Sequence, residues 1–298
     1  MQKGLDQNKA YAYWQVVGAS VQGSAHQAKE VPCQDDHSYR VLENGVLLIV
    51  VADGAGSAPE AAKGSSKVVE TAMDSLVQAI KVGPPVDQAG WEDLLSDVFF
   101  EARGALIELA EEENHEISDY ATTLTCAIVG PEWLAAGQVG DGLVVAQGKD
   151  QDLFSFIKPQ RGEYANETAF LSMENALTSM DVKVIQKPIA AVAVMSDGIL
   201  RLAVKLPDYQ PHEPFFQPIM TFVADNQVGD HAEELLERFL ASERVCARTE
   251  DDKTLVVAVQ ASSTVNPDSK APITDSKINT LDQGVDGREG QTSTSEPS

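Results

Sequence analysis

The stretch LLIVVADGAGSAPEAAKGS, residues 47–65, joins five consecutive aliphatic residues to an aspartate, Asp53, in a glycine-rich turn. An aliphatic run of this length is typical of a β-strand that is buried on both faces. A carboxylate at the end of such a strand is costly to bury unless it is paired, hydrogen-bonded or bound to a metal ion. The simpler alternative is a strand-to-helix turn, because Asp and Gly are common turn residues and Ser57 or a neighbour can cap the next helix. The stretch alone leaves both interpretations open.

Segments on either side of this stretch carry strand and helix patterns. Apolar runs predict strands over 14–22, 37–42, 46–52, 122–129, 133–139, 143–147, 189–195 and 255–260. Helical spacing of apolar residues predicts helices over 61–80, 91–109 and 231–240. Short turns join the three strands between 122 and 147, so we expect an antiparallel meander there. Consecutive hairpins with helices bunched between them predict antiparallel sheets with helices on the outside.

The composition restricts the partners and the compartment. The 298 residues carry a formal charge of −24, which nucleic acid and anionic membranes repel, so we expect neither as a partner. No apolar stretch has transmembrane length, and residues 1–9 lack the apolar core of a signal peptide. Cys33, Cys126 and Cys246 are far apart and odd in number, which indicates a reduced compartment rather than disulfides or a zinc site. We therefore expect a cytoplasmic protein.

The last 37 residues differ from the rest of the chain. Residues 262–298 are rich in Ser, Thr, Asp, Gly and Pro, contain no aromatic residue and show no apolar period. Such a segment buries too little apolar surface to offset the entropy of ordering it. We predict one domain over residues 1–261 and a disordered polar tail over 262–298. The tail is either a plain solvated segment or a carrier of phosphorylation or docking sites.

Carboxylates recur where predicted strands begin or end. Besides Asp53 these are Asp35 and Asp36, Asp141, Asp197, and the pair Asp251 and Asp252. In antiparallel sheets the end of one strand and the start of its neighbour share an edge, so five acidic sites are expected to meet at one end of the domain. Such a cluster repels itself unless a cation or protons offset its charge. Oxygen-rich sites with few His or Cys ligands suit Mg²⁺ or Mn²⁺.

The same residues, taken in order, carry a family resemblance. The motifs are CQDD (33–36), ADGAGSA (52–58), ATTLT (121–125), VGDG (139–142), MSDG (195–198) and DDKT (251–254). Their order resembles that of the type 2C metal-dependent protein phosphatases, in particular a bacterial branch whose first motif contains Cys-Gln-Asp. The resemblance runs from about Val16 to Val259. It implies an α+β fold, a four-layer α/β/β/α sandwich in which two packed antiparallel sheets are flanked by helices and metals lie at one end.

The resemblance also implies a set of metal ligands. Asp53 would bridge two Mn²⁺ or Mg²⁺ ions, and the Gly54 carbonyl would bind the second of them. Asp197 and Asp251 would complete the shell of the first ion. Asp141, together with Asp197, matches the position that holds a third and weaker ion in bacterial members.

Four further positions follow from the first, third and last motifs. Asp35 matches the acidic residue of the family's first motif, which is a water-mediated ligand or a neighbour of the ligands. Thr122, Thr123 and Thr254 match positions that we interpret as structural.

Two departures from the family pattern concern the substrate. Eukaryotic members have a histidine, proposed as general acid, where this chain has Ala55. The family's phosphate-binding arginine precedes the first motif, where this chain has only His26 and Lys29. His26 is the candidate replacement for the arginine. His26 and His37 are also candidates, beside a metal-bound water, for protonating the leaving group, although a lone histidine near a motif is more often structural. The segment 150–181 corresponds to the family's variable flap, and its residues Arg161, Asn166 and Thr168 either contact a phosphopeptide or pack within the loop.

The implied activity is hydrolysis of phosphoserine and phosphothreonine in proteins by a metal-bridging water. The catalytic residues would be Asp53, Asp197 and Asp251, the partners phosphorylated proteins and an opposing Ser/Thr kinase, and the protein a monomer. One alternative is a weak or inert phosphatase-fold module that binds a phosphorylated partner, and another is a cation-binding structural domain. Inert relatives tend to lose metal carboxylates, so the retention of all three aspartates favours an enzyme.

Overall fold

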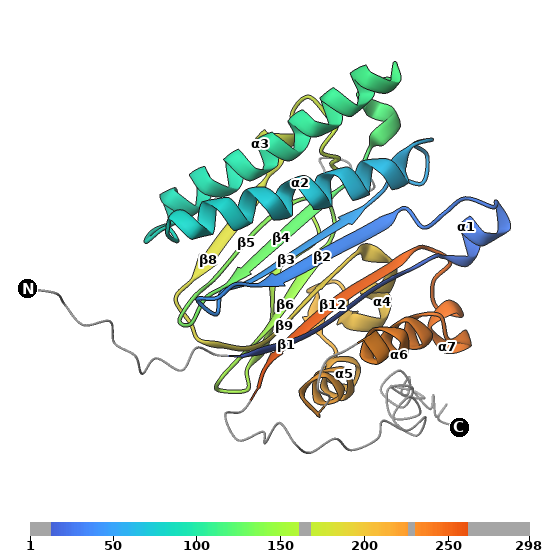
Figure 1. Ribbon diagram of the computed structural model, residues 1–298. Coiled ribbons are helices and arrows are strands. Elements are labelled where there is room, and N and C mark those ends of the chain that lie inside the picture. The colour runs from blue at the N-terminus through green and yellow to red at the C-terminus, as the bar shows by residue number, and fades with distance from the viewer. Residues whose placement is uncertain (1–12, 161–167, 226–229, 262–298) are drawn as a thin grey trace, which may run out of the picture.

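The computed structural model describes residues 13–160, 168–225 and 230–261. Within them, ten strands form two antiparallel sheets of five strands each (Figure 1). One sheet has the order β2 (Asp35–Val41), β3 (Leu47–Asp53), β4 (Leu124–Val129), β5 (Leu134–Val139) and β8 (Asp181–Ile185). The other has the order β1 (Trp14–Val21), β12 (Lys253–Gln260), β9 (Ile189–Met195), β6 (Leu143–Gly148) and β7 (Leu153–Ile157). The two sheets pack face to face.

Helices cover the outer face of each sheet, which confirms the predicted α+β sandwich (Figure 1). The first sheet carries α2 (Ala61–Val82) and α3 (Gln88–Glu113). The second carries α4 (Leu200–Ala203), α5 (Glu213–Asp225), α6 (Asp230–Leu240) and α7 (Glu243–Cys246). The short α1 (Ser24–Ala28) follows β1, a two-stranded ribbon joins β10 (Val204–Lys205) to β11 (Gln210–Pro211), and 3₁₀ turns lie at Ile117–Tyr120, Ala176–Ser179 and Asp197–Ile199.

The aliphatic run at β3 is buried on both faces, as predicted. Leu47, Ile49 and Val51 pack into the apolar layer between the two sheets. The alternate residues Leu48 and Val50 pack under α2 and α3. Because successive side chains of a strand point to opposite faces, both sets must be apolar, and the run is continuous for that reason.

The helices over the first sheet follow from the sequence signals around them. In α2, buried residues recur at helical spacing, among them Val68, Ala72 and Leu76. The side chain of Asp87 caps α3 by accepting a hydrogen bond from the Gly90 N–H at 2.9 Å. Asn114 ends α3 in the left-handed conformation, with φ of 58°. Both helices were predicted, and both extend beyond the predicted bounds.

The predicted meander over 122–147 is wrong. Strands β4 and β5 do pair, but β6 belongs to the other sheet, where it pairs with β7 and β9. Gly140 lies between β5 and β6 with φ of 125°, a conformation that residues with side chains rarely adopt. Its backbone also passes so close to Thr123 that a Cβ atom would lie 2.5 Å from that side chain. The short loop therefore crosses between sheets instead of closing a hairpin.

Two predictions, the disordered tail over 262–298 and the domain boundary after residue 261, are not tested, because residues 262–298 lie outside the described residues.

Among the described residues, no helix combines the length and apolar character needed to cross a membrane.

Candidate metal centre

The first sheet places two of the predicted carboxylates at one edge. Asp35 begins β2 and Asp53 ends β3, and the two residues are directly opposite in the antiparallel register. Thr123 fixes the backbone of Asp53, because its N–H donates to the Asp53 carbonyl at 2.8 Å and its Oγ1 accepts from the Asp53 N–H at 3.0 Å. The Thr122 hydroxyl also donates to the Asp53 carbonyl, at 3.0 Å. These two threonines therefore have the structural role that the sequence suggested.

The second sheet supplies two more carboxylates at the same end of the molecule. Asp197 lies two residues after β9, and Asp251 lies two residues before β12, which pairs antiparallel with β9. The strand ends are joined by a hydrogen bond from the Ser196 N–H to the Thr254 carbonyl at 3.2 Å. The hydroxyls of Ser196 and Thr254 also donate to Asp35, so the ends of the two sheets meet at one place.

Burial and mutual repulsion show that the carboxylates share one environment. Burial raises the pKa of the Asp53 carboxyl well above its usual range. Four further carboxylates raise that pKa through their charge, in the order Asp35, Asp197, Asp141 and Asp251. Burial also raises the pKa values of Asp35 and of Asp197 to about 7, and the charges of Asp141 and Asp251 add to the effect on Asp197. The pKa of Asp141 is likewise raised by burial.

Asp35 is held from one side only. Its Oδ2 accepts hydrogen bonds from Ser196 Oγ at 2.7 Å and from Thr254 Oγ1 at 2.8 Å. Its Oδ1 is buried and accepts no hydrogen bond from any described residue. A buried carboxylate oxygen without a donor is costly, and a cation or a cation-bound water is a suitable partner for it.

Gly54 lies where a side chain has no room. Its N–H donates to the Gln34 carbonyl at 3.1 Å. A Cβ atom at this position would lie 2.7 Å from that same carbonyl oxygen and 2.9 Å from Ala61. The close approach of three chain segments therefore requires glycine next to Asp53.

The donor set fits a hard cation. The predicted ligands are carboxylate and carbonyl oxygens, which Mg²⁺ and Mn²⁺ prefer, and a cation would relieve the repulsion among them. In the part of the chain that the structure describes, however, no three His, Cys, Asp or Glu side chains are arranged as a metal-holding group. The carboxylates are gathered in one region without forming a ready coordination shell.

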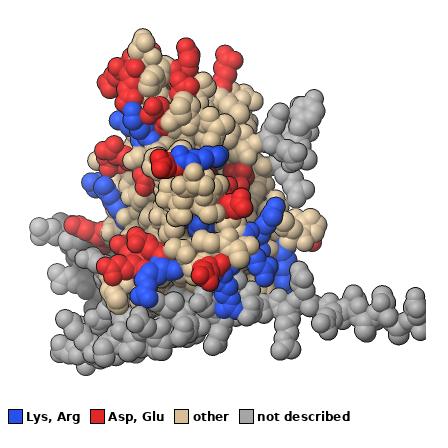
Figure 2. Space-filling view, turned by 90° about the vertical axis from the view of Figure 1, so that its right-hand side faces the viewer, with Lys and Arg blue, Asp and Glu red and all other residues tan. Residues whose placement is uncertain are grey.

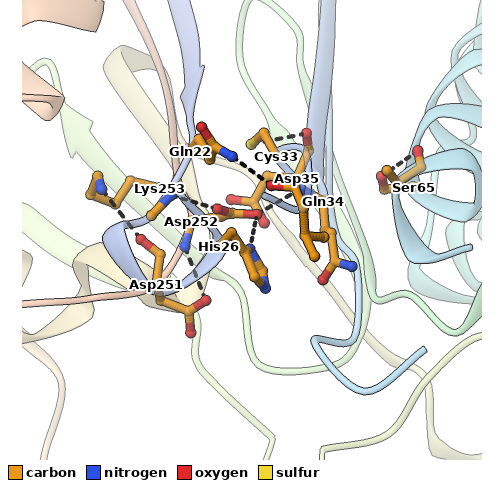
Figure 3. A network of polar contacts seen from close by, with 12 residues as sticks. Gln22, His26, Cys33, Gln34, Asp35, Ser65, Asp251, Asp252 and Lys253 are labelled. Atoms are coloured by element: carbon orange, nitrogen blue, oxygen red, sulfur yellow. Dashed lines mark hydrogen bonds and ion pairs between the residues drawn. The ribbon is translucent and has the colours of Figure 1, made fainter. Parts of the chain in front are cut away.

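Asp252 has a role that sequence reasoning missed. Its buried carboxylate accepts hydrogen bonds from the backbone N–H groups of Gly23 and Gln34, each at 2.6 Å (Figure 3). His26 Nδ1 lies 2.8 Å from Asp252 Oδ2, and the His26 side chain is buried as well. Asp251, its neighbour, is exposed. In the sequence, only the tandem of two aspartates in DDKT hinted at two roles. Asp251 faces the centre, and Asp252 holds the loops behind it.

His37 lies behind the carboxylates in a chain of hydrogen bonds. Its Nδ1 is 2.8 Å from Ser20 Oγ, which is 2.7 Å from Thr254 Oγ1, and Thr254 in turn donates to Asp35. Burial lowers the pKa of the His37 imidazole. This arrangement supports the structural interpretation of His37, and Thr254 lies in the same chain.

Cys33 has the character of a structural thiol. Its Sγ donates a weak hydrogen bond to the Asp35 carbonyl at 3.7 Å. Burial raises the thiol pKa far above its usual value, and the charge of Asp35 raises it further. The thiolate that a nucleophile requires is therefore disfavoured.

The described part of the flap contacts Asp141 through Thr168. The Thr168 hydroxyl donates to Asp141 Oδ2 at 2.6 Å. Arg161 and Asn166, the other two predicted contacts, lie outside the described residues. Thr168 thus links the flap to the candidate third metal position.

A cavity of about 910 Å³ opens beside the carboxylates, and His26, Gly56, Asp197 and Asp251 are among its lining residues. Another cavity, of about 680 Å³, lies between α2 and α3 and contains none of the candidate ligands. Of these two cavities, only the first adjoins candidate ligands.

Comparisons with known proteins agree with this geometry. The family model described as protein phosphatase 2C matches residues 22–241. Serine/threonine-protein phosphatase 3 of Escherichia coli (strain K12) is 34% identical over 255 residues, which are 83% of this chain and 99% of that protein. Among solved structures, serine/threonine phosphatase Stp1 from Staphylococcus aureus matches with a TM-score of 0.56 and 16% identity, covering 88% of this chain and 100% of that one. A C. elegans sex determining protein matches with a TM-score of 0.58 and 14% identity, covering 91% of this chain and 68% of that one.

Proposed function

The chain belongs to the protein phosphatase 2C family, and from this premise we propose that it hydrolyses phosphoserine and phosphothreonine in proteins with the help of divalent metal ions. The observation that carries the proposal is the meeting of Asp53 with Asp197 and Asp251, from two different sheets, in one shared electrostatic environment. No observation on the described residues favours an inert module, because each of these carboxylates is present.

We assign the carboxylates to metal binding. Asp53, Asp197 and Asp251, with the Gly54 carbonyl, would hold two Mn²⁺ or Mg²⁺ ions, and Asp141 would hold a third. Asp35 would contact this group through its free Oδ1. When bound, such ions supply positive charge for the phosphoryl oxygens and acidify an attacking water, which needs no covalent phosphoenzyme.

We assign His26 to the phosphate of the substrate. His26 Nδ1 lies 2.8 Å from Asp252 Oδ2, and the imidazole lines the cavity beside Asp197 and Asp251. A hydrogen bond from His26 to the phosphate would take the place of the arginine contact of other family members. A single imidazole is weaker than a bidentate guanidinium, so we expect modest affinity for phosphate.

The proposed partners are phosphorylated proteins, because such proteins are the substrates of a serine/threonine-protein phosphatase. An opposing Ser/Thr kinase, a monomeric state and a cytoplasmic location belong to the same proposal and remain predictions.

Chelation tests the proposal directly. Hydrolysis of a phosphoserine peptide should stop in EDTA and return on addition of Mn²⁺ or Mg²⁺ after the chelator is removed, because every proposed ligand is an oxygen. Phosphate release is the measurement, with circular dichroism as a control that the protein stays folded. Full activity after exhaustive chelation would contradict the metal dependence.

A further inference from the structure

Three basic side chains line the cavity beside the carboxylates. Lys29 lies after α1, Arg201 lies in α4 and Arg248 lies after α7, and all three line the cavity of about 910 Å³. Asp197 and Asp251 line the same cavity, so its basic part adjoins the candidate metal centre. Figure 2 shows this end of the molecule, the right-hand side of Figure 1, where Lys and Arg side chains lie interspersed with Asp and Glu. We call Lys29, Arg201 and Arg248 the basic wall.

The three cations of the basic wall are available to a ligand. Each is exposed, and none makes an ion pair or a side-chain hydrogen bond with another described residue. By contrast, Lys63 and Lys187 elsewhere on the surface pair with two carboxylates each. The basic wall therefore brings to one cavity three cations that have no carboxylate partner among the described residues.

The negative charge of the whole molecule explains why a cluster of cations near the site would be useful. A phosphorylated, acidic substrate is repelled by a protein of net charge −24 unless the field is reversed near the site. Arginine is well suited to this task, because its guanidinium binds carboxylate or phosphate through two parallel hydrogen bonds. Glu250 also lines the cavity, so an anion is favoured only on the side of the basic wall.

We propose that the basic wall binds a second anionic group of the substrate, a carboxylate or phosphate side chain close to the phosphoserine that is hydrolysed. This inference rests on the proposed function, because the scissile phosphate is placed beside Asp197 and Asp251. The preferred substrates are therefore acidic or multiply phosphorylated peptide segments.

Paired peptides test the inference. Two phosphoserine peptides that differ only in their flanking residues, Glu in one and Gln in the other, are compared by kcat/KM. A hydrogen bond to a charged group contributes about 1.5–3 kcal/mol, so we expect roughly a 10-fold preference for the acidic peptide. The preference should shrink as NaCl is raised, because the basic wall is exposed to solvent.

The double variant Arg201→Gln with Arg248→Gln should bring the ratio of the two kcat/KM values close to one. Lys81→Gln, an exposed lysine at the end of α2, is the matched control and should leave the ratio as in the wild-type protein. An equal rate on both peptides with the wild-type protein, or a preference that survives the double variant, would overturn the inference. Failure to hydrolyse either peptide with Mn²⁺ present would instead overturn the proposed function.

Discussion

Asp53 lies at the end of β3 with its backbone held by Thr122 and Thr123. The interpretation of Asp53 as a turn residue accounts for the position of its backbone, but not for the carboxylates that surround its side chain. Its neighbours are other carboxylates, which raise its pKa instead of lowering it. A turn residue gains nothing from such a site, whereas a metal ligand requires it.

The pH dependence of stability follows from these raised pKa values. The pKa values of Asp35 and Asp197 are about 7 in the folded protein, against an unperturbed 3.8. Between these values the unfolded state has already lost protons that the folded state keeps, so unfolding becomes more favourable as the pH rises. We expect the melting temperature of the metal-free protein to fall from about pH 4 to about pH 7 through these groups. Differential scanning calorimetry at several pH values, with and without Mn²⁺, measures the effect, and a metal-free melting temperature that rises through this range would count against it.

His26 offers a second test at the same scale. His26→Ala should raise KM for a phosphoserine peptide by roughly 10-fold, the value of one hydrogen bond to a charged group, and affect kcat less. Asp252→Asn should have an effect of the same kind, because its NH2 group must face the N–H of Gly23 or of Gln34 and so disturbs the loops around His26. His231→Ala, an exposed histidine on α6, is the control. An unchanged KM with a reduced kcat would mean that His26 does not contact the phosphate.

The types and order of the residues were enough to name the candidate ligands. They were not enough to assign different roles to two adjacent aspartates. Asp251 and Asp252 are identical in type and adjacent, and only the fold shows that one is exposed and the other is buried against His26. The distinction depends on Gly23 and Gln34, which lie more than two hundred residues earlier in the chain. No local pattern carries that information.

At the scale of elements, sequence patterns failed to predict a strand or helix correctly where tertiary contacts override the local conformational preference of the chain. The loop between β5 and β6 has the length of a hairpin, yet Gly140 turns it towards the other sheet. The apolar segment of α5 was not predicted as a helix, and it contains Pro218, a residue that usually ends one. Strand β8 lies at the edge of its sheet and is half-buried throughout, so its apolar pattern is weak.

The same loop between β5 and β6 presents Asp141 to the flap through Thr168. If Asp141 holds only a peripheral ion, Asp141→Ala should leave two tightly bound metals, reduce turnover and raise the Mn²⁺ concentration needed for half-maximal rate. Thr168→Val, which removes only the hydroxyl, should give a milder change in the same direction. Calorimetric titration and steady-state rates measure both. Loss of all metal binding in Asp141→Ala would place Asp141 in the main pair.

At the scale of the whole molecule, the site exists only because two sheets pack with their acidic edges together. Asp35 and Asp53 come from the first sheet, and Asp197 and Asp251 come from the second. The sandwich was predictable because strand runs, helical periods and motif order all pointed to the same architecture. The tail over 262–298 remains a prediction.

Calorimetric titration of Mn²⁺ into the wild-type protein and into Asp53→Asn tests the central claim, that carboxylates of both sheets form one metal centre. The wild-type protein should bind two ions tightly. Asp53→Asn should lose this binding and at least ~100-fold of its turnover, since even residues that only support metal ligands cost 10–100-fold when changed. Asp36→Asn, next to Asp35 in β2, is the matched control and should bind as the wild-type protein does. Two tightly bound ions in a folded Asp53→Asn protein would contradict the account.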